Sequence, residues 1–575
     1  MLSPEFEWIF FPKIGNDISL QGILKPGQIF KEGNNLIFRA DNLLVLKFLK
    51  EQNIEIDLIY IDPPYFAGSD EFIDVDLNSA HNSESSKSVS QFITFKKFAY
   101  ANLVPPKDSD EMLKQCGFSQ EEIEKGLGAL NDDNECIIKA IFENADRKIV
   151  DFCNWFFYRV KLMKEILSKC GIIVVRFDYH YGNYARLVLD YVFGEDHFIG
   201  EFMVRRMEKN VSDKSRGRQK QLNVANDSLF VYFKEEKSNI FDYPKKKKDL
   251  VENEQSNPKL YNFLSEWLNP KNNVWMDIVG YEKRKKTFYP TENSVELLER
   301  IIETFSIEGA NVADFFSGSG VTLSVASNKN RKWIGADIGE DSTIQSVRRL
   351  YNSNHRNFLW IRYLESENFT KMQKKENELF FYDELMTMEQ LKRLIANDKD
   401  EREITIFTNS SIIEYSLVRE KKIKIYHLFN NSENNTQAEQ YIELPELTLD
   451  YSENKIHLTS YKIKDKRFSA LQSVGSGNFE YLIEYFMILV PKGKSMWICK
   501  SAEFGKVMTT KKKREKPKLS IELSADMYIQ QDIYKISSKP GIILEICDIT
   551  GFKFKIFYTG GNEHAKSEWK CVKRQ

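Results

Sequence analysis

Between about residues 35 and 350 the chain alternates short apolar runs with longer segments of helical period, and this alternation limits the folds open to it. The run LIFRA (residues 36–40) precedes the helical DNLLVLKFLKEQ, and EIDLIYID (55–62) ends in a Pro-Pro pair that a central strand does not continue. Strands that alternate with helices are typical of an α/β domain with a largely parallel sheet. The sequence therefore predicts an α/β fold for this part.

Further βα units follow the same pattern. A helix over 151–169 precedes the strand GIIVVRFD (171–178), and a second helix is expected over about 181–193. A helix over 294–305 then precedes the strand NVADFF, a glycine turn, the helix VTLSVASN and the strand RKWIGAD. Beyond residue 366 the pattern changes to strand-like runs such as REITIFTN, KIKIYHLF, KIHLTSYKI, GIILEICDI and FKFKIFY, which predict a β-rich C-terminal domain.

Composition excludes several classes of protein. The 82 Lys and Arg residues nearly cancel the 84 Asp and Glu residues, so only local patches can attract an anionic partner. The seven Cys form no C-x-x-C pair, and with only seven His we expect no metal site. Since no signal peptide and no run of about 18 apolar residues is present, we expect a cytoplasmic protein without a membrane segment.

The glycine turn DFFSGSG (314–320) lies between a predicted strand and a predicted helix. Glycines allow the backbone to approach a ligand, and a helix N-terminus offers unpaired N–H groups, although such a turn can also be purely structural. About twenty residues later the next strand ends at Asp337, where a carboxylate would accept both hydroxyls of a ribose. Together these features predict a site for an adenosine-containing cofactor, with the candidate residues Asp314, Phe316, Ser317, Gly318, Gly320 and Asp337.

The second motif is Asp62-Pro63-Pro64-Tyr65, at the carboxyl end of the strand DLIYI, where open α/β sheets bind ligands. The Pro-Pro pair removes two N–H donors and fixes the backbone, so that the Asp62 carboxylate and the Pro63 carbonyl form a rigid pair of acceptors. Such a pair suits an exocyclic amine, and Tyr65 would stack on the ring that carries this amine. The alternative is a strand that simply ends in a turn.

These residues resemble the amino-group DNA methyltransferases of the β class, in which the catalytic motif precedes the cofactor motif. The phrases IFRADNLLVLKFL, GEDHFIGEF, VANDSLFVYFK and RKWIGADIGED are similar to modification subunits of Type III restriction-modification systems. The resemblance implies a Rossmann-like sheet in circularly permuted order, S-adenosyl-L-methionine as cofactor, and base flipping in double-stranded DNA. It further implies a homodimer and a possible separate restriction subunit.

The permuted order also gives Asp41 a role. In unpermuted methyltransferases the strand after the ribose-binding acid ends in a polar residue beside the adenine of the cofactor, and here that strand is LIFRA, with Asp41 at its tip. Asp41 is therefore expected to contact the cofactor, to cap the following helix, or to do both. Two segments depart from the family pattern: residues 289–294 read YPTENS where Pro-Thr-x-Lys-Pro is common, and residues 66–68 read FAG where Asn-Thr-Gly is usual.

The resemblance assigns five regions. They are an N-terminal extension (1–34), the catalytic half of the methyltransferase domain (35–204, with an insertion at 69–147), a target-recognition region (205–286), the cofactor-binding half (287–365) and the β-rich domain (366–575). Basic clusters support the third region, and Arg205, Arg206, Arg216 and Arg218 are the candidate DNA contacts, although a basic run can also be a solvated loop.

Adenine N6 is the expected target, because cytosine-N4 members more often carry Ser at the position of Asp62. Methylation of cytosine N4 and a non-catalytic recognition subunit of a nuclease are the alternatives.

Overall fold

The computed structural model describes residues 6–11, 35–66, 71–76, 94–100, 108–129, 145–205, 226–235, 273–281, 292–355 and 357–363, together with a series of strands between 373 and 571. At its centre six strands run parallel, in the order β12-β2-β11-β10-β3-β6. Their bounds are β2 Asn35–Arg39, β3 Ile56–Ile61, β6 Leu167–Phe177, β10 Asn311–Asp314, β11 Lys332–Asp337 and β12 Phe358–Tyr363.

Three more strands continue the sheet beyond β6. Strand β8 (Asn226–Phe233) is antiparallel to β6 and to β7 (Phe198–Arg205), and β9 (Val274–Val279) runs parallel to β7. Although β2 comes early in the chain, it pairs with β11, the strand that ends at Asp337. The predicted α/β class and the permuted strand order are therefore confirmed.

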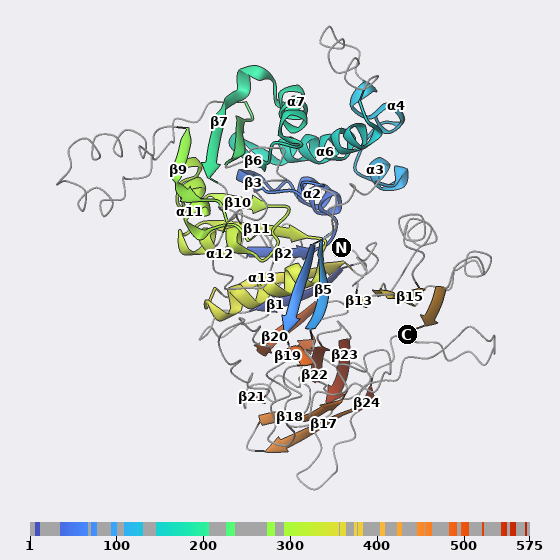
Figure 1. Cartoon of the computed structure of the whole chain (residues 1–575). Coiled ribbons are helices and arrows are strands. Elements are labelled where there is room, and N and C mark those ends of the chain that lie inside the picture. Colours follow the sequence, from blue (N-terminus) through green and yellow to red (C-terminus); the bar gives the residue numbers. More distant parts are fainter. Residues whose placement is uncertain are drawn as a thin grey trace, which may run out of the picture.

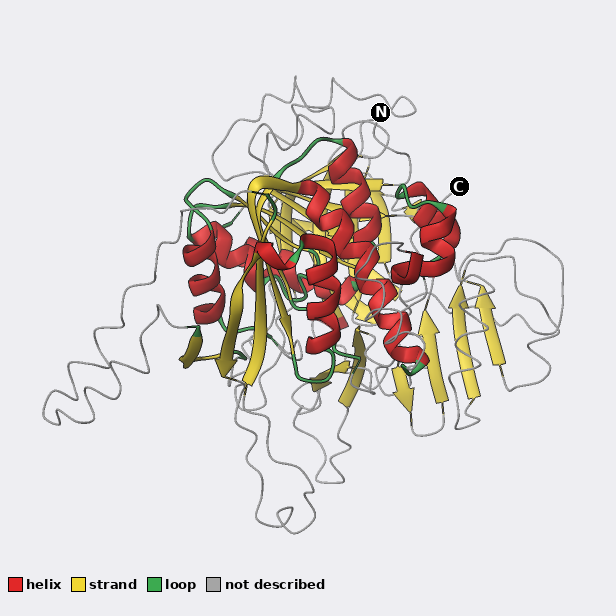
Figure 2. Ribbon diagram, turned by 90° about the horizontal axis from the view of Figure 1, so that it is seen from above, coloured by secondary structure: helices red, strands yellow, loops and turns green. Residues whose placement is uncertain are grey.

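Helices cover both faces of these strands (Figures 1 and 2). Helices α2 (Asn42–Glu51), α6 (Arg147–Ile166) and α7 (Gly182–Phe193) share one core, and α11 (Val295–Phe305), α12 (Val321–Asn328) and α13 (Glu340–Asn352) share the other. In β2, Leu36 and Phe38 belong to the first core and Ile37 to the second. Because both faces are buried, the strands are continuously apolar, which is the pattern that made them recognisable in the sequence.

The β-rich C-terminal part is joined to this sheet. Strands β19 (Ile483–Pro491), β20 (Met496–Phe504), β22 (Ile542–Asp548), β23 (Lys553–Tyr558) and β24 (Lys570–Cys571) lie in the order β24-β23-β22-β19-β20 and meet β12 through β1 (Phe6–Phe11). One fifteen-stranded sheet thus crosses the predicted boundary at 365, and Figure 1 shows its orange and red strands beyond β1. The predicted domain limits themselves stay predictions.

The remaining described elements are small. Strands β13 (Gln373–Lys375), β14 (Glu378–Tyr382), β15 (Glu403–Thr408) and β16 (Ile423–His427) form one sheet, and β17 (Glu446–Ser452), β18 (Lys455–Lys462) and β21 (Ser520–Glu522) form another. The predicted insertion contributes the pair β4 (Glu71–Asp76) and β5 (Thr94–Tyr100), and α3 (Asp110–Gln115), α4 (Gln120–Lys125) and η3 (Gly126–Ala129); η4 (Glu195–His197) precedes β7. Within the described residues, no helix is long and apolar enough to cross a membrane.

Candidate active site

The two predicted motifs end neighbouring strands. Strands β3 and β10 are parallel partners, with Leu58 opposite Val312 and Ile59 opposite Ala313. Asp62 follows β3 directly, and Asp314 is the last residue of β10. The chain leaves β10 toward β11 on one side, whereas β6 pairs with β3 on the other. This is the topological switch point at which open α/β sheets form their ligand crevice.

The glycine turn after β10 is tied to the end of β11. Ser317 N–H donates to the Ala336 carbonyl at 3.0 Å, and Gly318 N–H donates to Asp337 Oδ2 at 2.8 Å. Gly320 has a φ of 74°, and a Cβ on it would lie 2.6 Å from Ser346 Oγ on α13. A side chain at Gly320 would therefore be strained and would also collide with α13, so this glycine is needed for both reasons.

Two carboxyls flank this turn, one on the buried Asp314 and one on the partly buried Asp337. Burial raises the pKa of Asp337 to about 6, although hydrogen bonds from Gly339 N–H and Gly318 N–H work in the opposite direction. Burial likewise raises the pKa of Asp314 to about 7, against hydrogen bonds from Thr322 and from the backbone of Phe316. The charge on Asp62 also raises the pKa of Asp314, which places the two motifs within electrostatic reach of each other.

Asp62 has a defined set of hydrogen-bond donors. Tyr65 Oη donates to Asp62 Oδ1 at 2.6 Å, and Asn293 Nδ2 donates to Asp62 Oδ2 at 3.0 Å. The Asp62 side chain is 13% exposed, and burial raises its pKa, while Arg176, Tyr65 and Asn293 lower it. Because a carboxylate offers about four acceptor positions, Asp62 can accept a further hydrogen bond from an amine.

Arg176 anchors the far side of this network. Its guanidinium is fully buried at the end of β6, donates to Asp227 Oδ2 at 2.6 Å, and lies 3.8 Å from Asp62 Oδ2. It also donates to Asn293 Oδ1 and lies 4.0 Å from the ring centre of Tyr281. The Tyr281 hydroxyl lies 3.2 Å from that of Tyr65.

Sequence reasoning missed this second layer around Asp62. One signal was available, since Arg176 is a charged residue inside the otherwise apolar run GIIVVRFD. The others, Asp227, Tyr281 and Asn293, come from three distant segments, and no local pattern marks them. Tyr65 was expected to stack on the target ring. Its hydroxyl contacts are defined here, and the stacking stays a prediction.

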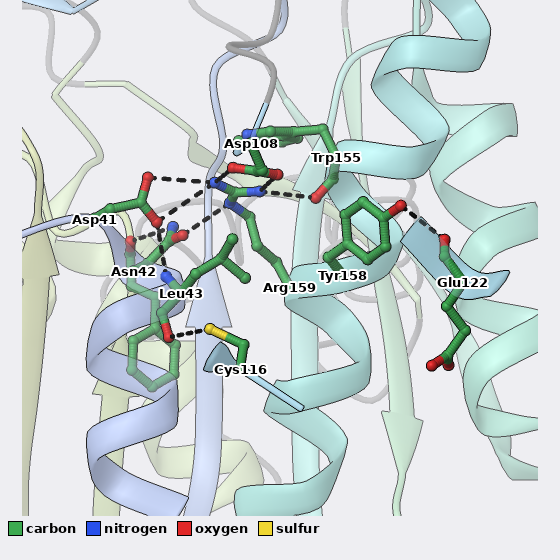
Figure 3. A network of polar contacts seen from close by, with 10 residues as sticks. Asp41, Asn42, Leu43, Asp108, Cys116, Glu122, Trp155, Tyr158 and Arg159 are labelled. Carbon is green, nitrogen blue, oxygen red and sulfur yellow. Dashed lines mark hydrogen bonds and ion pairs between the residues drawn. The ribbon is translucent and has the colours of Figure 1, made fainter. Parts of the chain in front are cut away.

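Asp41 caps helix α2, which confirms one of the two roles expected for it from the sequence; the other is contact with a cofactor. It precedes α2, and its Oδ1 accepts from Leu43 N–H at 2.8 Å. Figure 3 shows that Arg159 lies between Asp41, Asn42 and Asp108. Asn42 in turn donates to the Phe315 carbonyl at 3.2 Å, which connects the start of α2 to the glycine turn. Asp41 is therefore near the predicted cofactor site, and its contact with a cofactor stays a prediction.

The turn also offers polar and aromatic groups to a ligand. Ser317 Oγ is buried and has no hydrogen-bond partner among the described residues. The Phe316 ring is partly buried and lies 5.7 Å from the Trp155 ring, centre to centre. Of the predicted DNA contacts, Arg205 ends β7, and Arg206, Arg216 and Arg218 lie outside the described residues.

The comparisons with known proteins decide the family. The model of the N6/N4 DNA methylases matches residues 56–348, just over half of the chain, and this range contains both the turn after β3 and the glycine turn. The chain belongs to the N6/N4 family of DNA methylases. The predicted resemblance to amino-group DNA methyltransferases is thus confirmed.

Curated relatives of this chain include the Type II methyltransferase M.BamHI of Bacillus amyloliquefaciens. It is 34% identical over 142 residues, which make up 24% of this chain and 33% of that protein. The Mod subunit of the Type III enzyme StyLTI of Salmonella typhimurium is 25% identical over 205 residues, 36% of this chain and 24% of that protein. The matches span a third or less of these two relatives. A solved structure of an M1.HpyAVI–SAM complex is 16% identical in sequence, with a TM-score of 0.30. The match covers 55% of this chain and 99% of the chain in that structure.

Proposed function

We infer that this chain is a site-specific DNA methyltransferase that transfers a methyl group from S-adenosylmethionine to the N6 amino group of adenine in duplex DNA. One observation carries the proposal. The turn Asp62–Tyr65 and the glycine turn, which resemble the two halves of such an active site, end adjacent parallel strands at the switch point of the sheet. An amine held at Asp62 and a cofactor held at residues 316–320 would therefore meet in one crevice.

The residues at the glycine turn fit the proposed cofactor. Asp337 would accept hydrogen bonds from ribose hydroxyls, and Ser317 Oγ is buried with no hydrogen-bond partner among the described residues. Asp41 follows β2, which pairs with β11 on the side away from β10. Its carboxylate could accept a hydrogen bond there from an amino group of the cofactor. When bound, S-adenosylmethionine would supply a methyl group on a positively charged sulfur.

The chain's own residues would act on the target amine. Asp62 would accept a hydrogen bond from it, and the Pro-Pro pair would keep this carboxylate and the Pro63 carbonyl in fixed positions. The amine of a stacked base cannot reach such a turn, so the base must leave the duplex, which costs a few kcal/mol. Tyr65 would replace part of the lost stacking.

Asp at position 62 supports adenine over cytosine as the target, because the cytosine-N4 members of the family more often carry Ser there. The similarity to a Mod subunit supports a role in restriction and modification, with a separate restriction subunit as partner and a homodimer as the assembly. The basic segment 205–220 would contribute to DNA binding.

A methylation assay tests the proposal. The purified chain is incubated with isotope-labelled S-adenosylmethionine and unmethylated bacterial DNA, and the modified nucleosides are separated and identified by mass spectrometry. N6-methyladenine is the expected product, whereas N4-methylcytosine would show the alternative target and no product would favour a non-catalytic recognition subunit. The Asp62→Ala variant should lose more than a hundredfold in rate and keep its calorimetric affinity for the cofactor. A loss of less than tenfold would remove Asp62 from the catalytic role.

A further inference from the structure

Residues Glu292 and Asn293 connect the two halves of the site. They precede α11, in the segment where the chain departs from the family's Pro-Thr-x-Lys-Pro pattern. Asn293 contacts the catalytic Asp62, and its neighbour Glu292 contacts Ser319 in the glycine turn. Because the two residues are adjacent in the chain, a single peptide unit joins the contact with Asp62 to the contact with the glycine turn.

The contacts of Asn293 require an amide. Its Oδ1 accepts from Arg176, which can only donate, and its Nδ2 donates at 3.0 Å to Asp62, which when ionised can only accept. These partners fix which way the amide points. Arg176 Nη1 and Asp62 Oδ2 are 3.8 Å apart, which is beyond hydrogen-bond distance, so Asn293 provides the hydrogen-bonded link between the buried cation and the carboxylate.

The backbone of this segment is also held in place. Asn293 forms a β-bridge with Tyr281, and Ser294 N–H donates to the Gly280 carbonyl at 3.0 Å. Ser294 then caps α11 by accepting from Leu297 N–H at 3.2 Å. The backbone that carries the Asn293 side chain is therefore held in place by hydrogen bonds on both sides.

Glu292 is bound to the glycine turn in two ways. Its Oε2 accepts from Ser319 Oγ at 3.2 Å, and its Oε1 lies 2.8 Å from Arg349 Nη2 on α13. Arg349 Nε also donates to the Ser319 carbonyl at 2.8 Å. The turn that would hold the cofactor is therefore tied to Glu292 both directly and through Arg349.

We propose that Asn293 is a positioning residue for Asp62, and that Glu292 couples this positioning to the state of the glycine turn. Binding at the turn would then favour the orientation of Asp62 that accepts the target amine, so that the carboxylate is ready only when a cofactor is present. The proposal deepens the proposed function and rests on it, because the coupled event is the use of Asp62 in methyl transfer.

Loss of the Asn293 amide should act on rate and on pH dependence. The Asn293→Ala variant should lower kcat by about 10- to 100-fold, the range expected for a misplaced catalytic group, with the KM for S-adenosylmethionine within twofold of wild type. Because Asn293 donates to the ionised form of Asp62, its removal should raise the pKa of Asp62. The acid limb of the kcat/KM profile should therefore move to higher pH.

The isosteric Asn293→Asp variant should move the acid limb of the kcat/KM profile further, because it places a second carboxylate within hydrogen-bond distance of Asp62. The other titratable or charged groups that face Asp62 are unchanged in both variants; they are Tyr60, Tyr65, Arg176, Asp227, Tyr281 and Asp314. The matched control is Asn311→Ala. This change removes a hydrogen bond from the Asn311 side-chain amide to the Glu55 carbonyl, at the opposite end of β10. Its kcat and its acid limb should stay at wild-type values.

A double-mutant cycle tests the role of Glu292. Glu292→Gln keeps an acceptor for Ser319 and removes the charge opposite Arg349, and it should lower kcat in the wild-type background. In the Asn293→Ala background it should have no further effect on kcat, because its influence passes through the missing amide. Effects that multiply independently would overturn the coupling.

The outcomes separate this proposal from the proposed function. If the wild-type chain methylates DNA and both Asn293 variants match Asn311→Ala in kcat and in acid limb, the positioning role is wrong and the methyltransferase assignment stands. If the wild-type chain binds S-adenosylmethionine and methylates no DNA, the proposed function is wrong, and the positioning role falls with it. Thermal unfolding of each variant shows whether a loss of rate reflects a loss of folded protein.

Discussion

Three carboxyls, Asp62, Asp314 and Asp337, share one property at the residue scale. Each lies at the carboxyl end of a parallel strand, and burial raises the pKa of each. A carboxylate loses hydration when it is buried at a strand end, and hydrogen bonds from donors such as the Gly318 and Gly339 N–H groups offset only part of that loss. Raised pKa values at neighbouring strand ends are typical of a functional site.

The pKa of about 6 at Asp337 predicts how cofactor affinity depends on pH. The ionised carboxylate accepts hydroxyls and the protonated form does so less well, so affinity for S-adenosylmethionine should be constant above about pH 7. It should fall by up to tenfold per pH unit as the pH decreases below about 6. Calorimetric titration between pH 5 and pH 8 measures this.

The control for this titration is Asp337→Asn, which should bind weakly and without the step near pH 6. A step that persists in this variant would belong instead to Asp314, whose pKa is about 7. Equal wild-type affinity at pH 5 and pH 8 would contradict a role of the ionised Asp337 in cofactor binding.

At the scale of elements, the start of α2 combines a structural and a proposed functional role in Asp41. Its Oδ1 caps the helix through Leu43 N–H, and its Oδ2 lies 3.4 Å from Arg159 Nη2. Asp41→Ala should lower the free energy of unfolding by about 1 kcal/mol, whereas Asp41→Asn should nearly preserve it, because Asn caps a helix as well as Asp. Urea denaturation measures both differences.

Cofactor affinity then separates the two roles of Asp41. If the carboxylate also accepts from an amino group of the cofactor, Asp41→Asn should weaken binding of S-adenosylmethionine although it keeps the helix cap. Unchanged affinity in Asp41→Asn would leave Asp41 with the capping role alone.

The segment that begins at the last residue of β7 carries the predicted DNA contacts Arg205, Arg206, Arg216 and Arg218. Neutralising these four residues together should weaken binding to duplex DNA and flatten its salt dependence by roughly one unit of slope for each lost phosphate contact. Fluorescence anisotropy over a salt series measures the slope, and affinity for S-adenosylmethionine should be unchanged. Unaltered affinity and slope would mean that DNA is bound elsewhere.

On the scale of the whole molecule, buried ion pairs fasten the C-terminal strands to the methyltransferase sheet. Arg362 of β12 contacts both carboxylate oxygens of Glu545 on β22, at 2.6 and 2.9 Å, and Tyr485 of β19 donates to the same carboxylate at 2.7 Å. Arg348 of α13 pairs with Glu484 at 2.6 Å. The β-rich part is therefore packed against the parallel sheet and helix α13 through buried pairs of opposite charge.

Removal of one partner from the central pair should destabilise the full chain. Glu545→Ala removes the carboxylate that contacts the buried Arg362 guanidinium at two oxygens, which should cost about 3 to 5 kcal/mol, whereas replacing both residues with Met should recover much of the loss. The matched control is Glu121→Ala, which breaks the exposed Lys125–Glu121 pair and should cost less than about 1 kcal/mol. Urea unfolding curves measure the difference, and similar losses for the buried and the exposed pair would contradict the role of Glu545.

The sequence by itself determined many of the helices and strands of the parallel sheet, although β12 and α13 were not predicted. Strand β2 was expected over 36–40 and covers 35–39, and α12 was expected over 321–328 and has those limits. Apolar period is a local property, and in this sheet both faces are buried, so the pattern is strong enough to read without knowing which segments meet. The order of the two motifs predicted the permuted sheet through the resemblance to the β-class DNA methyltransferases.

Only the tertiary structure decided how the groups around Asp62 are connected. Arg176, Asp227 and Asn293 come from β6, β8 and the segment before α11, and although Arg176 stands out in an apolar run, no local pattern shows that the three meet. The continuation of the sheet through β1 into the C-terminal strands was likewise invisible, because strand pairing depends on which distant edges meet. A buried polar group acquires its role from partners that are far away in the chain, and local sequence patterns contain no information about such partners.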